Sequence, residues 1–297
     1  MSDFLEAGQS EAGWHRASTF LLCPRRFAME QAAKASGEAR GLSPALVSGT
    51  LLHAGLAHLY ARRMSGKHDW MEPYAAIQEA ARRGDKESPT PLWDEWAERL
   101  KDVIPQYVRR WGAERQWEVM GVEEELRVEV MDPRTGASYL YTQRYDLLIR
   151  NRSDRQVYII DHKRGYELAP RIWNRYALSG QIAGYKMLGR VLYGLQFGGV
   201  LLNFVQMPGK DDGLDFQFKF MRPSLPQAEQ AARDFKGTVI HVERGIAACR
   251  DAYGPEQTNA TAWPGVFQDG PPCMGPFGPC PFRDYCRTGQ TNQPREW

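Results

Sequence analysis

Two short apolar runs, each carrying one acid, constrain the fold of this chain more than any other feature. Residues 145–149 contain Asp146, and residues 158–163 contain Asp161. Apolar runs of this length are typical of buried strands. Because side chains on a strand alternate between its two faces, Asp161 and Lys163 point to the same side. The sequence therefore predicts an acid and an amine directed at one spot.

Asp146, Asp161 and Lys163 have the chemistry of a metal-dependent phosphodiesterase. Carboxylate oxygens suit hard cations such as Mg²⁺ and Mn²⁺. A neighbouring ammonium can orient or activate a metal-bound water and offset the charge of a phosphate. An acid two residues before a lysine also occurs at ordinary strand ends as a solvated ion pair. On these three residues alone, both interpretations stay open.

Two predicted helices carry further candidate residues. Residues 44–64 have the periodicity of a helix that places His53 and Tyr60 on one face. Residues 171–193 fit a helix that presents Gln181 and Tyr185 one turn apart. Taken alone, His53 is equally explained as a packed histidine, and Gln181 and Tyr185 as contacts between a helix and a sheet.

In their order and spacing these stretches give the chain a resemblance to the PD-(D/E)xK nuclease superfamily, in particular to its RecB-like exonuclease branch. The resemblance runs from about residue 18 to residue 286. It implies that the segment ending at His53 is the helix with a metal-binding histidine, and that Asp146 is the first acid of the site. It also implies that the triplet Asp161, His162 and Lys163 is the acid-x-lysine signature.

The same resemblance assigns roles to the remaining candidates. Gln181 and Tyr185 are similar to the branch's Gln-x-x-x-Tyr motif and are expected to line the site. One or two cations are expected on Asp146, Asp161, the carbonyl of His162 and His53. An outer ligand is expected from Glu123, Glu124 or Glu125, and an acidic strand edge explains these three residues nearly as well.

Four of the five cysteines stand at opposite ends of the chain. Cys23 lies near the start, and Cys273, Cys280 and Cys286 lie near the end. This set is similar to the iron–sulfur clasp of AddB-type and CRISPR-adaptation exonucleases, which implies a 4Fe–4S cluster. The family has two residues between its second and third cysteines where this chain has six. A Cys₄ zinc site and unligated cysteines remain alternatives.

Charge and hydropathy limit the partners and the compartment. The net charge of the 297-residue chain is +2, so a field that binds DNA must be local. Residues 141–176 hold eight Lys/Arg against four Asp/Glu, which fits a basic surround for an acidic site or a merely solvated face.

No run approaches the roughly 18 apolar residues of a membrane helix, and the polar start lacks a signal-peptide core. We expect a cytoplasmic protein without membrane contact, whose cysteines are ligands or buried thiols rather than disulfides. Cys249 is expected to be a small buried residue.

The resemblance implies an α/β fold of the restriction-endonuclease type, with helices flanking a central mixed sheet. We expect a polar lead at 1–17 and one nuclease domain at 18–297, with a helical insertion at 65–117, a catalytic core at 119–206 and a cysteine-rich clasp at 254–290. The expected strands are 119–130 with its hairpin partner 139–150, then 156–161, 199–206 and 214–220. The other expected helices are 74–83, 92–116 interrupted at Pro105, and 226–253.

The expected function is a Mg²⁺- or Mn²⁺-dependent DNA exonuclease that acts on single strands or opened duplex ends in recombination, repair or phage DNA metabolism. Two alternatives follow from the same residues. One is a CRISPR-adaptation nuclease that trims DNA before integration, and the other is a DNA-binding subunit with vestigial catalysis and a structural cluster. Protein partners are possible but are not identified by the sequence.

Overall fold

The computed structural model describes residues 10–36, 42–66, 72–111, 114–209, 211–226, 229–266, 273–275 and 278–288. Part of the predicted lead and part of the predicted clasp therefore lie outside the described residues. Contacts divide the chain into two compact units. The first, here called the sheet unit, comprises Met1–Ser10, Leu42–Val128 and Thr142–Phe235. The second, the cysteine unit, comprises Glu11–Gly41, Glu129–Tyr141 and Lys236–Trp297.

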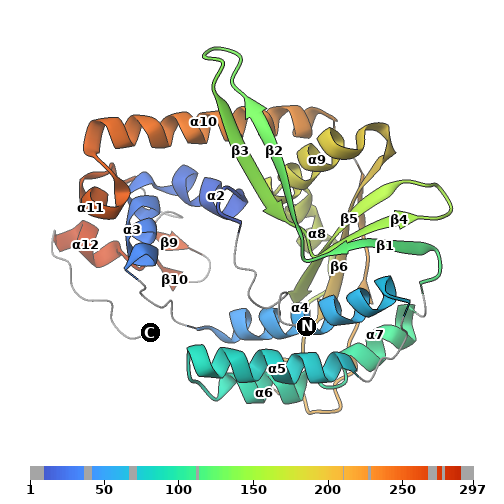
Figure 1. The fold of residues 1–297 in the computed structure, drawn as a ribbon. Coiled ribbons are helices and arrows are strands. Elements are labelled where there is room, and N and C mark those ends of the chain that lie inside the picture. Colours follow the sequence, from blue (N-terminus) through green and yellow to red (C-terminus); the bar gives the residue numbers. More distant parts are fainter. Residues whose placement is uncertain are drawn as a thin grey trace. The chain divides into compact units, whose positions relative to one another are not determined.

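A six-stranded mixed sheet forms the centre of the sheet unit (Figure 1). Its strands are β1 (Trp117–Val122), β4 (Leu147–Asn151), β5 (Val157–Gly165), β6 (Phe197–Gln206), β7 (Phe220–Met221) and β8 (Ser224–Pro226). The order is β1-β4-β5-β6-β7, and β8 also pairs with β6. Only β5 and β6 run parallel, with Asp161 opposite Leu202 and Lys163 opposite Phe204. The predicted central mixed sheet is confirmed.

Helices pack on both faces of this sheet. One face shares a core with α4 (Pro44–Met64), α5 (Glu72–Glu87), α6 (Leu92–Arg99) and α7 (Val103–Trp111). The other face packs against α8 (Pro170–Ala177) and α9 (Gly180–Tyr193), which is followed by the short η1 (Gly194–Gln196). Leu147 and Ile149 point to the first core and Leu148 to the second, as strand alternation requires.

Two predicted helices are each split in the structure. The expected helix 92–116 is α6 and α7, with the break at Leu100–Asp102 rather than at Pro105. Pro105 lies in the first turn of α7, where a missing N–H costs nothing. The expected helix 171–193 breaks before Ser179, whose hydroxyl accepts the N–H of Ile182 at 3.3 Å and caps α9.

In the predicted hairpin of 119–130 with 139–150 the two segments do pair, but each segment is interrupted once. The first segment is divided into β1 and β2 (Glu125–Met131), and the second into β3 (Ser138–Arg144) and β4. β1 pairs with β4 in the central sheet, whereas β2 and β3 form a separate two-stranded ribbon. Glu123 causes the first break, because its φ of 53° is in the left-handed region that no strand residue adopts.

The expected strand 214–220 is also largely absent, since only β7 is strand there. The side chain of Gln106 takes the place of a neighbouring strand. Its amide donates to the carbonyl of Phe216 at 3.1 Å, and its oxygen accepts the N–H of Phe218 at 2.8 Å.

The cysteine unit is mainly helical. Its elements are α2 (Trp14–Leu22), α3 (Pro24–Ala35), most of α10 (Glu229–Tyr253), α11 (Glu256–Asn259), η2 (Ala260–Ala262), β9 (Met274–Gly275), β10 (Gly278–Pro279) and α12 (Arg283–Thr288). Trp263 is fully buried and its ring lies 6.0 Å from that of Phe27. This apolar anchor at the start of the tail was not predicted. Within the described residues, every helix is too short or too polar to cross a bilayer.

Candidate active site

A group of three potential metal ligands lies in the sheet unit. His53 comes from the middle of α4, Glu123 follows β1, and Asp146 precedes β4. One ligand atom of each residue lies within 4.8 Å of the others. Nδ1 of His53 is 3.6 Å from Oε1 of Glu123 and 3.4 Å from Oδ1 of Asp146. Two carboxylates and one imidazole at this spacing can hold a divalent cation such as Mg²⁺ or Mn²⁺.

The local backbone explains why Glu123, of three consecutive acids, belongs to this group. Its left-handed conformation ends β1, and its N–H donates to the carbonyl of Asp146 at 3.1 Å. Glu124 instead accepts from the hydroxyl of Tyr145 at 2.9 Å, and Glu125 pairs with Arg127 on the surface. A non-glycine residue in this conformation costs about 1–3 kcal/mol and is most often retained at functional sites.

Asp161, Lys163, Gln181 and Tyr185 form a second, connected group. Nζ of Lys163 lies 2.7 Å from Oδ2 of Asp161 and donates to Oε1 of Gln181 at 3.1 Å. The amide nitrogen of Gln181 donates to Oδ1 of Asp161 at 3.2 Å. The hydroxyl of Tyr185 lies 2.7 Å from the carbonyl of Arg144 and 3.4 Å from Oδ1 of Asp161. The ammonium of Lys163 is therefore fixed by two partners, one of which Tyr185 also contacts.

His162 joins the two groups through its backbone. Its N–H donates to Oδ2 of Asp146 in a short hydrogen bond, and its carbonyl oxygen is 3.2 Å from Nε2 of His53. Its ring stacks on Tyr60 at 6.0 Å between centroids and meets the ring of His53 edge-on at 5.8 Å. The predicted metal and catalytic residues of the sheet unit therefore lie in one connected cluster: His53, Asp146, Asp161, His162, Lys163, Gln181 and Tyr185.

Burial and neighbouring charges set the protonation of this cluster. Burial alone would lower the pKa of His53, but Asp146 and Glu123 outweigh it, and the pKa is well above the usual value. Burial alone would raise the pKa of Asp146, but His53 outweighs it and the pKa is low. For Asp161 burial prevails, and its pKa is raised despite the attraction of Lys163. Burial would lower the pKa of Lys163, yet Asp161 and Asp146 raise it, so the amine stays charged.

Comparison with known families agrees with this arrangement. The model of the PD-(D/E)XK nuclease superfamily matches residues 14–287. The chain is a member of the PD-(D/E)XK nuclease superfamily. Membership implies metal-dependent nuclease activity with DNA as the substrate, and it confirms the predicted restriction-endonuclease-like fold.

Other comparisons add little detail. No curated protein matches the chain. Among solved structures, it is similar to one described as "Crystal structure of SSO0001", at 12% identity over 73% of this chain and 85% of that chain, with a TM-score of 0.26.

Four cysteines line one small cavity in the cysteine unit, together with Arg25, Arg26 and several apolar groups. The cysteines are Cys23, Cys273, Cys280 and Cys286. The N–H of Cys280 donates to the carbonyl of Cys273 at 2.9 Å, and Nη1 of Arg25 is 3.7 Å from Sγ of Cys286. Burial raises the pKa of Cys280, and the nearby Cys23 and Cys286 add to that effect. Cys249 lies elsewhere, packed against the apolar core of this unit.

Several of the eight basic side chains predicted to surround the site have partners within the protein. Arg144 donates to the carbonyl of Glu123, while Arg150 pairs with Glu118 and Arg171 with Glu167. A groove of about 430 Å³ that the sequence did not indicate lies between α7 and the segment before β7. Among the residues that the structure describes, its lining contains three basic and no acidic side chains: Gln106, Arg109, Arg110, Gln217, Phe218, Lys219 and Phe220.

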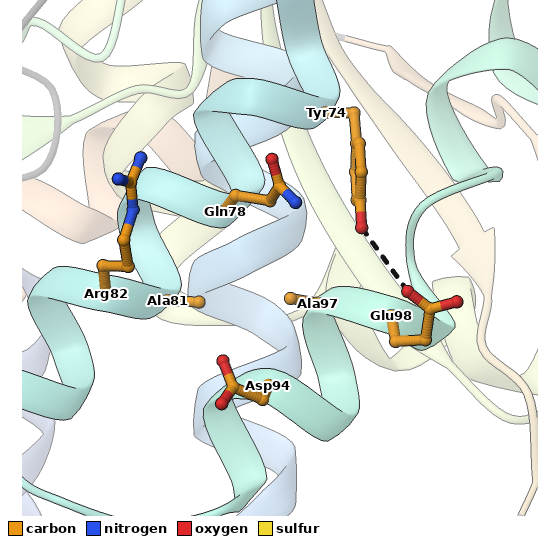
Figure 2. Close-up of a pocket in the computed structure, with 7 residues that line it drawn as sticks. All are labelled: Tyr74, Gln78, Ala81, Arg82, Asp94, Ala97 and Glu98. Carbon is orange, nitrogen blue, oxygen red and sulfur yellow. Dashed lines mark hydrogen bonds between the residues drawn. The ribbon is translucent and has the colours of Figure 1, made fainter.

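A hollow of about 570 Å³ lies between α5 and α6, within the predicted helical insertion (Figure 2). Its polar lining combines Arg82 and Gln78 with Asp94 and Glu98, and the hydroxyl of Tyr74 lies 3.5 Å from Glu98 (Figure 2). Among the described residues, no three side chains of this lining form a ligand group for a cation, and Arg82 is its single basic side chain. None of the nominated site residues lines it.

Proposed function

We propose that the chain is a Mg²⁺- or Mn²⁺-dependent deoxyribonuclease that degrades DNA from an end, in the manner of the RecB-like branch. One observation carries the proposal. A lysine held by Asp161 and Gln181 stands beside a ligand group of one histidine and two acids, and the backbone of His162 links the two. The Gln181 and Tyr185 pair, which resembles the motif of that branch, supports the exonuclease assignment.

The residues of this chain would divide the work as follows. His53, Glu123 and Asp146 would hold the cation. Asp161 and the carbonyl of His162 are the further ligands that the resemblance to the RecB-like branch implies. A cation held by these residues would polarise the phosphate and lower the pKa of a water molecule. Lys163 orients the attacking water and offsets the developing negative charge on the phosphate. Gln181 and Tyr185 keep Asp161 and Lys163 in position.

A pair of DNA substrates tests the proposal. Linear single strands labelled at one end and circular single strands of the same sequence are incubated with Mg²⁺, with Mn²⁺ or with EDTA. We expect degradation of the linear strand with metal, an intact circle, and no reaction in EDTA. Equal cutting of the circle would establish an endonuclease, and an intact linear strand at all metal concentrations would overturn the nuclease assignment.

We also propose that Cys23, Cys273, Cys280 and Cys286 hold a 4Fe–4S cluster. Convergence of four cysteines on one cavity supports a shared metal group. The resemblance to the iron–sulfur clasp of AddB-type and CRISPR-adaptation exonucleases favours a cluster over a single zinc ion.

A further inference from the structure

A buried polar network lies in the sheet unit on the side of β5 where the His162 ring points. Glu114 and Arg222 form its centre, with side chains 3% and 9% exposed. Taking an ion pair out of water costs several kcal/mol per ion, so such a pair is weak evidence of stabilisation. The proposed chemistry uses neither residue, which raises the question of what the network does.

Contacts on every side fix the guanidinium of Arg222. It pairs with Glu114 and donates to the hydroxyls of Tyr60 and Tyr107. Its Cζ lies 4.0 Å from the ring centroid of Trp111 and 4.5 Å from that of Trp117. Stacked aromatic rings and an ion pair leave the side chain of Arg222 a single orientation.

From Arg222 the network leads to His162 through one amide. Nε of Arg222 donates to Oδ1 of the fully buried Asn203 at 3.0 Å. Arginine has no acceptor, so the oxygen of the amide must face it and the NH₂ group must face the other way. That NH₂ lies 2.8 Å from Nδ1 of His162. Because an NH₂ group only donates, Nδ1 must accept, which fixes both the tautomer and the ring orientation of His162.

His162 connects this network to α4 as well as to the acids. Its ring stacks on Tyr60 at an interplanar angle of 17° and meets the ring of His53 edge-on at 5.8 Å. His53 and Tyr60 are two turns apart on α4, so both face β5. The hydroxyl of Tyr60 donates to Glu114 at 2.9 Å, which closes the network on the helix that carries His53.

We propose that Arg222, acting through Asn203, is a positioning residue for the metal centre. It locks the ring of His162 against Tyr60 and so fixes the separation of α4 and β5. That separation sets the position of the His53 imidazole, whose Nε2 lies 3.2 Å from the carbonyl oxygen of His162 and whose Nδ1 faces Glu123 and Asp146. The inference rests on the proposed function for the identity of the metal site, but its consequence is a change in metal affinity rather than in chemistry.

The test compares Asn203→Ala with Gln106→Ala, both in the sheet unit. Each substitution removes two side-chain hydrogen bonds, but those of Gln106 lead to Phe216 and Phe218 and not to His162. Mn²⁺ binding to each purified protein is measured without DNA by electron paramagnetic resonance. We expect Asn203→Ala to weaken binding by about 10- to 100-fold, the usual effect of groups behind metal ligands, and Gln106→Ala to change it less than about twofold.

Thermal denaturation, run in parallel, separates positioning from folding. A merely structural Asn203 would lower the melting temperature and leave Mn²⁺ binding per folded molecule at the wild-type value, and that result would overturn the inference. Equal weakening by Gln106→Ala would overturn it as well. His162→Phe provides a second variant, since it keeps a ring against Tyr60 but cannot accept from Asn203, and it should weaken Mn²⁺ binding to a similar degree.

A DNA cleavage assay on the same samples distinguishes this inference from the proposed function. Wild-type protein that binds Mn²⁺ but leaves DNA intact would remove the proposed function while the effect of Asn203→Ala on binding stands. Wild-type protein that cleaves DNA, together with unchanged Mn²⁺ binding by Asn203→Ala and by His162→Phe, would remove this inference alone.

Discussion

The backbone N–H of Glu123 donates to the carbonyl oxygen of Asp146 at 3.1 Å. This bond joins the residue that follows β1 to the residue that precedes β4, and each of the two contributes a carboxylate to the same ligand group. Both ligands therefore lie just outside a strand, at the positions where β1 ends and β4 begins. Glu123 adopts a left-handed backbone conformation at this interruption, which is strained for a residue other than glycine.

Glu123→Gly should separate metal binding from stability. Glycine adopts a positive φ without strain, so the free energy of unfolding of the metal-free protein should stay the same or rise by up to about 1 kcal/mol. Mn²⁺ affinity should fall by at least about tenfold, because one carboxylate ligand is lost. Denaturant unfolding in EDTA and Mn²⁺ titration measure the two effects. A clear loss of stability would show that the Glu123 side chain supports the fold.

Lys163→Ala should remove catalysis and leave the metal site in place. The rate of cleavage at saturating Mn²⁺ should fall by about 10²- to 10⁴-fold, because a positioned charge at the reacting phosphate is lost. Single-turnover cleavage of labelled DNA measures this rate. Lys101→Ala, which removes a lysine paired with Glu98 outside the site, is the control and should cleave normally. Full activity of Lys163→Ala would contradict the proposed mechanism.

Gln181→Ala and Tyr185→Phe should each slow cleavage by about 10- to 1,000-fold, the range for groups that position others. Each substitution removes a hydrogen bond to Asp161. Gln181→Ala also removes one of the two hydrogen-bond partners of the Lys163 ammonium. Activity per folded molecule is the relevant measure, since Tyr185 is nearly fully buried. If both variants lose thermal stability but keep their turnover, these side chains serve the fold only.

Metal affinity should rise with pH across the neutral range. The pKa of His53 is raised in the metal-free protein, because Asp146 and Glu123 outweigh the effect of burial, so the imidazole is protonated at neutral pH. A cation needs the neutral ring and must displace that proton. Below the pKa of His53, affinity should therefore increase by about tenfold per pH unit for the one proton released, and above it the dependence should level off. Mn²⁺ titrations at several pH values test this, and His53→Gln should flatten the profile.

Protein purified without oxygen should be brown and contain about four irons per chain. Serine in place of Cys23, Cys273, Cys280 or Cys286 should remove the colour and make the cysteine unit easier to digest, because the binding energy of the cluster is also folding energy. Cys249→Ser is the matched control and should keep its iron. Stoichiometric zinc without iron would replace the cluster by a zinc site and leave the nuclease assignment untouched.

Sequence alone nominated the two acids, the lysine, the histidine and the Gln181 and Tyr185 pair, because these rest on local periodicity and on resemblance. The sequence did not show which of Glu123, Glu124 and Glu125 is the ligand. That depends on the left-handed backbone conformation of Glu123, which secondary-structure propensities do not predict. The interruption of the predicted hairpin at Glu123 was missed for the same reason. Arg222 was not nominated, because its partners Glu114, Tyr60 and Asn203 lie far apart in the chain and meet only through packing.

A proton on His53 also determines how the buried charges balance in the metal-free site. With the imidazolium beside Asp146 and Glu123, and the ammonium of Lys163 beside Asp161, opposite charges already compensate one another before any cation arrives. A divalent cation that binds to His53 would displace this proton. The buried charges of the site are therefore balanced in the metal-free protein, and the sheet unit does not need a cation to compensate them.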